Sequence, residues 1–195
     1  MPHGRCISAL LWGSLLTLVS SPAVALPGQT PDDAQRWMRS NATLRPAPGE
    51  KLMVKKSNTP AQRLIFRATA FPVGRATVTS GGMIRSEEIS LYDMIHGINL
   101  GRLEEALRVI YGVTVYQDYS QAERVYAYPD RATLNRAVNQ QTPLLAALQG
   151  EVRQGERYAY WSEIARQPNG FPYTGRITVF LKEDVPKLQA ELSRR

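Results

Sequence analysis

Cysteine and histidine are almost absent from this chain of 195 residues. The single cysteine, Cys6, lies near the N-terminus, and the two histidines are His3 and His96. One cysteine cannot form an intramolecular disulfide, and so few cysteines and histidines cannot build the ligand clusters that hold zinc. We therefore expect a core stabilised by packing alone, with no metal and no other cofactor.

Motifs for nucleophilic catalysis are also missing. The chain contains no Gly-x-Ser-x-Gly elbow, which would present a serine at a strand-to-helix turn. His96 has no partner nucleophile in the sequence, and Asp93, three residues earlier, favours a structural hydrogen bond to its ring. The adjacent pairs Glu87–Glu88 and Glu104–Glu105 are expected to be solvated surface, because neighbouring side chains point apart. We assign no catalytic residue.

Long apolar runs are limited to one segment near the N-terminus, from Ile7 to Val19. Arg5 precedes this run, and the small residues Ala-Val-Ala at 23–25 follow it, a pattern typical of a cleavable signal peptide. The run is shorter than the roughly 20 apolar residues that a membrane-spanning helix needs. We predict that residues 1–25 are a signal peptide and that the protein is exported to the periplasm, the medium or an equivalent lumen.

The net charge of +7 is unevenly spread along the chain. Residues 26–85 contain ten basic and three acidic residues, whereas residues 86–195 contain 13 basic and 14 acidic residues. Such an excess attracts an acidic protein, an anionic envelope polymer or an anionic membrane, and salt weakens the attraction. Nucleic acid fits the charge equally well, but export would separate it from the protein. The alternative is that the basic side chains merely solvate one face.

Sequence patterns predict the secondary structure and the fold class. After the signal peptide, residues 26–50 supply an N-terminal helix and a proline-rich connection, and residues 51–195 form one domain. Alternating patterns predict strands over 51–56, 63–71, 76–79, 83–85, 113–117, 124–128, 156–161 and 176–181. Capping residues and helical spacing predict helices over 30–40, 90–97, 100–111, 130–138, 142–150 and 184–193. Because strands and helices come in blocks, we predict an α+β fold, a mostly antiparallel sheet with several short helices in a single compact domain.

The strand predicted over 63–71 has one apolar and one basic face. Arg63 and Arg67 alternate with apolar residues, as in a half-buried antiparallel sheet. Lys55 and Lys56 add positive charge in the strand before it. We predict that these four residues form a basic face that binds an acidic partner.

Tyrosine is concentrated in the second half of the chain. Seven of the nine tyrosines lie between Tyr111 and Tyr160, and the triplet Tyr-Ala-Tyr occurs twice. Residues two apart in a strand point to the same side, so each triplet presents two phenol rings together. Such rings can contact a sugar or a partner protein, or pack across the sheet or beneath a helix. We predict an aromatic binding surface that consists of Tyr126, Tyr128, Tyr158 and Tyr160, and we expect the adjacent Trp161 in the core.

These observations leave more than one class of function open. The preferred class is an exported, non-catalytic binding or interaction protein of the cell envelope, whose basic and tyrosine-rich surfaces engage an acidic partner. The alternative is an envelope enzyme that acts on a polysaccharide or peptide through carboxylates, which requires two carboxylates in one cleft. Peripheral contact with an anionic membrane is a variant of the first class.

Overall fold

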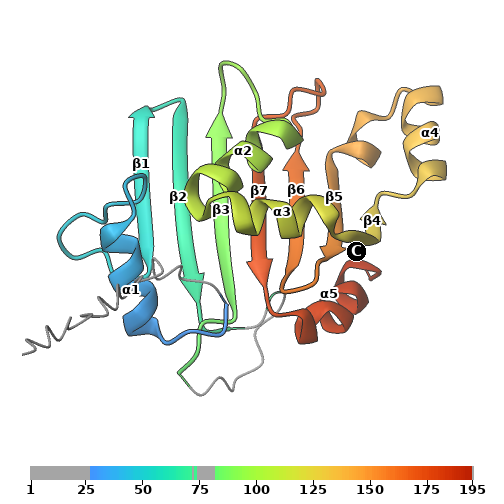
Figure 1. Ribbon diagram of the computed structural model, residues 1–195. Helices are drawn as coiled ribbons and strands as arrows, with labels where there is room; N and C mark the ends of the chain where they lie inside the picture. Colours follow the sequence, from blue (N-terminus) through green and yellow to red (C-terminus); the bar gives the residue numbers. More distant parts are fainter. Residues whose placement is uncertain (1–26, 72, 74–81, 195) are drawn as a thin grey trace, which may run out of the picture.

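The computed structural model describes residues 27–71, 73 and 82–194 (Figure 1). The predicted signal peptide and the predicted strand at 76–79 lie outside these residues. Seven strands form one antiparallel sheet in the order β1-β2-β3-β7-β6-β5-β4. Their bounds are β1 (Met53–Thr59), β2 (Gln62–Thr69), β3 (Ser86–Asp93), β4 (Glu123–Tyr128), β5 (Leu148–Gln154), β6 (Ala159–Ala165) and β7 (Thr174–Phe180). The predicted α+β fold with an antiparallel sheet in a single compact domain is confirmed.

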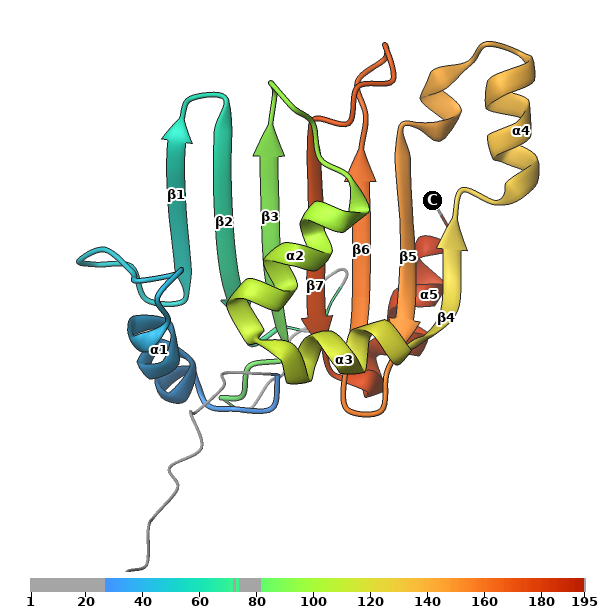
Figure 2. The same ribbon diagram turned by 45° about the horizontal axis from the view of Figure 1, so that its top comes forward.

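The helices lie on both sides of the sheet. They are α1 (Pro31–Ser40), α2 (Leu100–Tyr111), α3 (Val113–Gln121), α4 (Arg131–Asn139) and α5 (Val185–Leu192), with 3₁₀ turns at Pro143–Ala146 and Lys182–Asp184. Helices α1, α2 and α3 cover one side, which we call the helical face (Figures 1 and 2). Helix α5 covers one corner of the other side, which we call the open face. No helix in the described part of the chain is long and apolar enough to cross a membrane.

Two apolar clusters hold these layers together. On the helical face, Phe66 of β2 lies beside Ile89 of β3, which lies beside Ile177 of β7, and all three are fully buried. Trp37 of α1 joins this cluster and stacks on Tyr111 of α2, with ring centroids 5.6 Å apart. A smaller cluster on the open face packs α5 against β5, β6 and β7. The sheet therefore shares its two faces between a large and a small core.

Local patterns misassigned four segments. The predicted strand at 83–85 is wrong, because these residues precede β3, which begins at Ser86. The predicted helix at 90–97 is wrong, because Ser90–Asp93 ends the central strand β3. The predicted strand at 113–117 is wrong, because these residues begin α3, which buries Val115 and Tyr119. The predicted helix at 142–150 is reduced to a 3₁₀ turn, and β5 begins at Leu148.

Candidate functional site

Three of the four predicted basic residues share the open face. In the register of β1 and β2, Lys55 lies opposite Ile65, so it points to the same side as Arg63 and Arg67. The guanidinium carbon of Arg63 lies 4.2 Å from the centroid of the Tyr92 ring. Within the described residues, none of these three cations has a salt bridge. The fourth, Lys56, points to the helical face.

The two tyrosine triplets lie on opposite sides of the sheet. Tyr126 and Tyr128 of β4 are half-buried on the open face, with ring centroids 6.1 Å apart. Tyr158 and Tyr160 pack into the core of the helical face, where the Tyr160 hydroxyl donates to Asp118 at 2.6 Å. Strand β5 also separates the triplets. The open face therefore carries five of the eight predicted site residues, with Lys55, Arg63 and Arg67 on β1 and β2 at one edge of the sheet and Tyr126 and Tyr128 on β4 at the opposite edge.

A polar cluster that the sequence did not reveal occupies the centre of the open face. Glu163 of β6 accepts a hydrogen bond from the Tyr128 hydroxyl and binds Nη2 of Arg176 at 2.6 Å. The hydroxyl also accepts a hydrogen bond from Nε1 of Trp161 at 2.9 Å. The guanidinium carbon of Arg176 lies 4.1 Å from the Trp161 ring centroid. Trp161 is buried, as predicted.

This cluster borders a pocket of 260 Å³ that also includes Glu88 of β3. Glu88 lies 3.5 Å from Arg176, so this guanidinium bridges two carboxylates. Burial raises the pKa of Tyr128 well above its usual value, and the hydrogen bond to Glu163 raises it further. The phenol therefore stays protonated and donates to Glu163 at neutral pH.

Glu87 is fully buried on the helical face. The expectation that it forms solvated surface is wrong, because β3 is a central strand and the helices cover this side. The Tyr111 hydroxyl donates to its carboxylate at 2.7 Å. Burial nevertheless raises the pKa of Glu87 to about 7.

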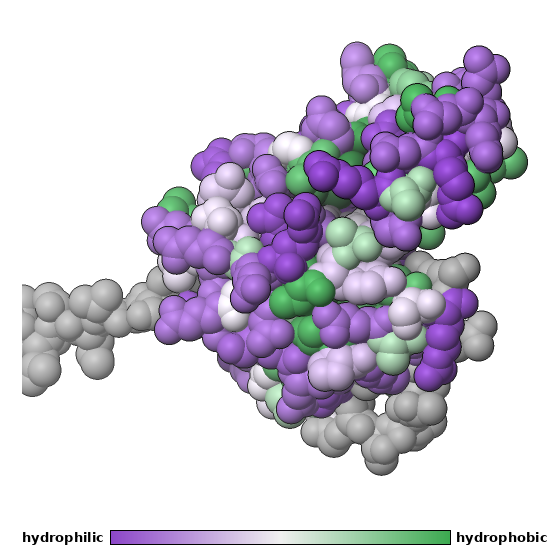
Figure 3. Space-filling model, turned by 90° about the vertical axis from the view of Figure 1, so that its right-hand side faces the viewer, coloured by the Kyte–Doolittle hydropathy of each residue, from purple (hydrophilic) through white to green (hydrophobic). Residues whose placement is uncertain are grey.

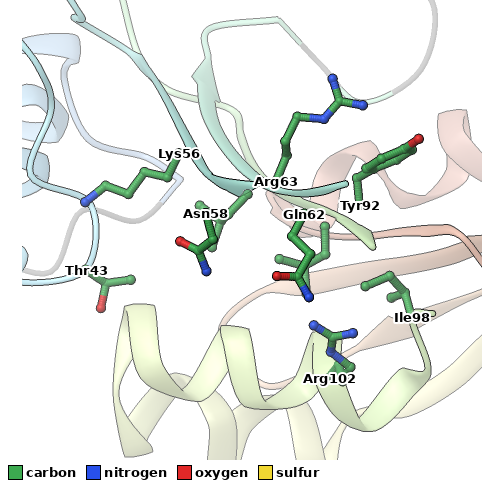
Figure 4. Close-up of a pocket in the computed structure, with 10 residues that line it drawn as sticks. Thr43, Lys56, Asn58, Gln62, Arg63, Tyr92, Ile98 and Arg102 are labelled. Atoms are coloured by element: carbon green, nitrogen blue, oxygen red, sulfur yellow. The ribbon is translucent and has the colours of Figure 1, made fainter. Parts of the chain in front are cut away.

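A groove on the helical face runs between α2 and the strands β1, β2 and β3. One end is a pocket of 360 Å³ near Lys56, Gln62 and Arg102 (Figure 4). In this view Lys56 extends over Thr43 and Arg102 points toward Gln62, whereas the side chains of Arg63 and Tyr92 extend to the other side of the strands, although both residues also line the pocket. A second pocket of 370 Å³ continues along α2. The two pockets share four lining residues: Thr43, Leu64, Leu91 and Arg102.

Asp93 fixes the polar end of this groove. Its buried carboxylate accepts hydrogen bonds from Arg102 at 2.7 Å and Gln62 at 3.1 Å, and from the backbone amides of Ile95 and His96 at 2.9 Å. The pKa of Asp93 is therefore far below its usual value, with the His96 amide and the Arg102 guanidinium as the main favourable causes. The exposed His96 ring lies 3.5 Å from Asp93, and its hydrogen bond is to the Gln62 amide at 3.3 Å rather than to Asp93 as expected.

Helix α4 stands apart from the main body. Seen from the β4 edge, the molecule is hollowed beneath the projecting lobe that contains α4 (Figure 3). Apolar side chains are exposed on this lobe, with Val138 77% exposed and Leu144 69% exposed.

In the described ranges, no group of three or more histidine, cysteine, aspartate or glutamate residues is arranged to hold a metal ion. The protein has an α+β fold built on one antiparallel sheet, with two candidate sites: the open face and the groove on the helical face. No protein-family model matches the chain, and comparisons with curated proteins and with solved structures find no match.

Proposed function

We propose that this protein is an exported, non-catalytic binding protein of the cell envelope that engages an acidic partner through the open face of its sheet. One observation carries the proposal. Lys55, Arg63 and Arg67 lie together on this face without a salt bridge in the described residues, whereas the acidic side chains Glu88 and Glu163 bind Arg176. The part of the face on β1 and β2 is therefore positively charged. Export rests on the predicted signal peptide.

The proposal gives different roles to the predicted residues. Lys55, Arg63 and Arg67 supply charge, which steers a partner toward the face and sets the salt dependence of binding. Tyr126 and Tyr128 supply contact area at the other end of the same face. Tyr158 and Tyr160 instead stabilise the core beneath α3, and Lys56 faces the groove, so none of these three residues contacts the partner.

The partner engages side chains rather than adding a strand to the sheet. Strand β1 is an edge strand, and exposed edges can pair with another chain. Here the carboxylate of Glu50 accepts a hydrogen bond from the backbone amide of Lys55 at 3.0 Å. Because this amide is already satisfied, strand addition along β1 would have to displace Glu50.

Cross-linking in cells tests the proposed interface. The full chain, and a variant with Arg63→Glu and Arg67→Glu, are cross-linked at low and moderate salt, and the captured species are identified by mass spectrometry. The matched control is Arg36→Glu with Arg39→Glu on α1, which changes the net charge equally but on the other side of the sheet. We expect an acidic partner joined through residues 51–85, with at least about tenfold less capture for the open-face variant and little change for the control.

Cross-linking together with a vesicle-binding measurement separates the possible partners. Capture of an acidic protein or an anionic polymer that depends on Arg63 and Arg67 supports the proposal. Binding to vesicles of anionic lipid that salt abolishes would instead identify the membrane as the surface contacted. Equal capture by the open-face variant and the wild type, with the same salt dependence, would contradict the proposal.

A carboxylate-dependent enzyme is the second candidate, and the pocket at the centre of the open face favours it. This pocket brings Glu88 and Glu163 together, with Tyr128 hydrogen-bonded to Glu163. Both carboxylates bind Arg176, so both already stabilise a cation rather than stand ready to protonate a leaving group. Incubation of envelope polysaccharide and peptide with the purified protein distinguishes the candidates, because an enzyme shortens the chains and a binding protein does not.

A further inference from the structure

The groove on the helical face has the composition of a small-molecule site. Its two connected pockets, of 360 and 370 Å³, are each in the size range of protein pockets for small ligands. Arg63 and Tyr92 also line the first pocket, although their side chains extend to the open face, whereas Arg67 lines neither pocket. The groove and the surface proposed above therefore adjoin only at Arg63. An inference about the groove therefore stands independently of the proposed function.

The floor and one wall of the groove are apolar. Leu64 and Leu91 are half-buried neighbours in the register of β2 and β3 and line both pockets. Ala106 and Val109 of α2 extend the apolar wall in the second pocket. Val109 is 50% exposed, which is high for a valine beside a core. A hydrocarbon chain placed here would remove this apolar surface from water.

Positive charge is gathered at one end of the groove. The ammonium group of Lys56 has no salt bridge within the described residues, and its side chain borders the first pocket above Thr43 (Figure 4). Arg102 of α2 borders the same pocket and points toward Gln62, held in place by the bond from its Nη1 to Asp93. The amides of Asn58 and Gln62 lie between these two cations; the Gln62 amide already donates to Asp93, and the Asn58 amide adds a further hydrogen-bond donor. The acidic residue of the second pocket, Glu105, is bound to Arg108 at 2.6 Å.

We propose that this groove binds a single-chain amphipathic carboxylate, with its hydrocarbon chain along Leu64, Leu91 and Ala106 and its carboxylate between Lys56 and Arg102. Charge complementarity selects the anion, because Lys56, Arg102 and the Asp93 carboxylate that Arg102 binds carry a net positive charge, which repels an amphiphile with a cationic head. The apolar floor selects the chain, because a sugar or a short polar acid would leave its hydroxyl groups unpaired. A free fatty acid is the simplest molecule of this class.

Titration of the purified protein with three probes tests this proposal. Decanoate carries both the chain and the charge, decyltrimethylammonium carries the chain with the opposite charge, and acetate carries the charge without the chain. Binding is followed by calorimetry below the micellar concentration of each amphiphile. We expect saturable 1:1 binding of decanoate and no comparable binding of the other two. Equal binding of the two decyl amphiphiles would overturn the proposal, and so would a lack of decanoate binding.

Adjacent lysines provide the matched variants. Lys56→Gln removes the cation that faces the groove, and we expect it to weaken decanoate binding about tenfold. Lys55→Gln removes the same charge from the same strand but on the opposite face, so it should leave the affinity within about twofold. If the two variants weaken binding equally, the effect comes from net charge and the proposed position of the carboxylate is wrong.

A groove-filling variant locates the hydrocarbon chain. Thr43 lines both pockets and its hydroxyl makes no hydrogen bond within the described residues, so Thr43→Phe should obstruct the groove without breaking a bond. We expect at least tenfold weaker binding of decanoate with an unchanged circular dichroism spectrum. Unchanged binding by this folded variant would place the ligand elsewhere. The single variant Arg67→Glu, at a residue that lines neither pocket, should bind decanoate normally, so failure of the groove and failure of the open face can be distinguished.

Discussion

Glu87 places a titratable carboxyl group within the apolar core of the helical face. Its Oε2 accepts the hydrogen bond from Tyr111, but its Oε1 has no hydrogen-bond partner in the described part of the structure. A buried oxygen without a partner costs free energy, and an ionised carboxylate costs more than a protonated one. The protonated form of Glu87 is therefore the form that suits the folded state.

The raised pKa of Glu87 predicts a pH dependence of stability. Its pKa is about 7 in the folded state, against the ordinary value of 4.5 that we take for the unfolded chain. As the pH rises, the carboxyl group of the unfolded chain loses its proton around pH 4.5, whereas that of the folded protein keeps it until about pH 7. The stabilising contribution of Glu87 is therefore fully present below pH 4.5 and is lost as the pH rises through about 7. The difference in pKa corresponds to about 3 kcal/mol. Urea denaturation at pH 4 and pH 8 measures this loss.

Comparison with variants isolates the share of Glu87 in the pH dependence. In Glu87→Gln we expect the destabilisation between pH 4 and pH 8 to shrink by about 3 kcal/mol relative to the wild type. Glu88→Gln is the matched control, because the next residue along β3 points to the open face and should leave that destabilisation in place. An unchanged pH dependence in Glu87→Gln would show that the carboxyl group is not buried as described.

At the scale of elements, the edge strand β4 reaches the centre of the open face through a glycine. Tyr128 extends across β5 to reach Glu163 on β6, and it crosses β5 at Gly150. A Cβ atom at position 150 would lie 2.5 Å from the Tyr128 hydroxyl oxygen and 2.7 Å from the Ser162 carbonyl oxygen. Both distances are too short for a real contact, so position 150 must be a glycine for this cluster to form.

Substitution of this glycine should therefore displace Tyr128. We expect Gly150→Ala to destabilise the protein by about 1–3 kcal/mol, the usual cost of overpacking. It should also change the fluorescence of Trp161, whose indole loses its bond to the Tyr128 hydroxyl. The control is Gly101→Ala in α2, where the added Cβ would lie 3.5 Å from its nearest neighbouring atom and alanine favours the helix. Equal effects of the two substitutions on stability and fluorescence would contradict this account of Gly150.

The success of sequence-based prediction differed from element to element. Helix α2 was predicted with its bounds, because Leu103 and Leu107 fall on one buried stripe and Gly112, at a positive φ of 82°, ends the helix. Segments without such agreement were misassigned. The capping pattern at Ser90–Asp93 competes with the alternation of Glu87, Ile89 and Leu91, and pairing with β2 and β7 decides for the strand. At 113–121, β-branched residues suggest a strand, but the spacing of Val115 and Tyr119 matches the helix that covers Tyr160.

At the scale of the whole molecule, strand order decided which predicted site residues meet. The alternation in β2 predicted that Arg63 and Arg67 share a face, and the register confirms it. Nothing local indicates that β3 pairs with β7 or that β5 separates β4 from β6. The polar cluster of Tyr128, Glu163 and Arg176 was therefore missed, since its members come from three strands far apart in the chain. The adjacent glutamates at 87–88 were one signal for a polar group on this face. Adjacent strand residues face opposite sides, so one of the two had to lie on the open face.

One sheet carries both cores, so the whole molecule should unfold as a single cooperative unit. Trp37 reports on the large core and Trp161 on the small one. In Trp37→Phe and in Trp161→Phe, we expect the remaining fluorescence and the far-ultraviolet circular dichroism to change at the same denaturant concentration. Leu188→Ala in α5 should lower the stability by about 2–5 kcal/mol by both probes, although it touches only the small core. A fluorescence transition of Trp161 that precedes the loss of secondary structure would instead show that the α5 corner opens before the sheet, and that the open face changes shape without global unfolding.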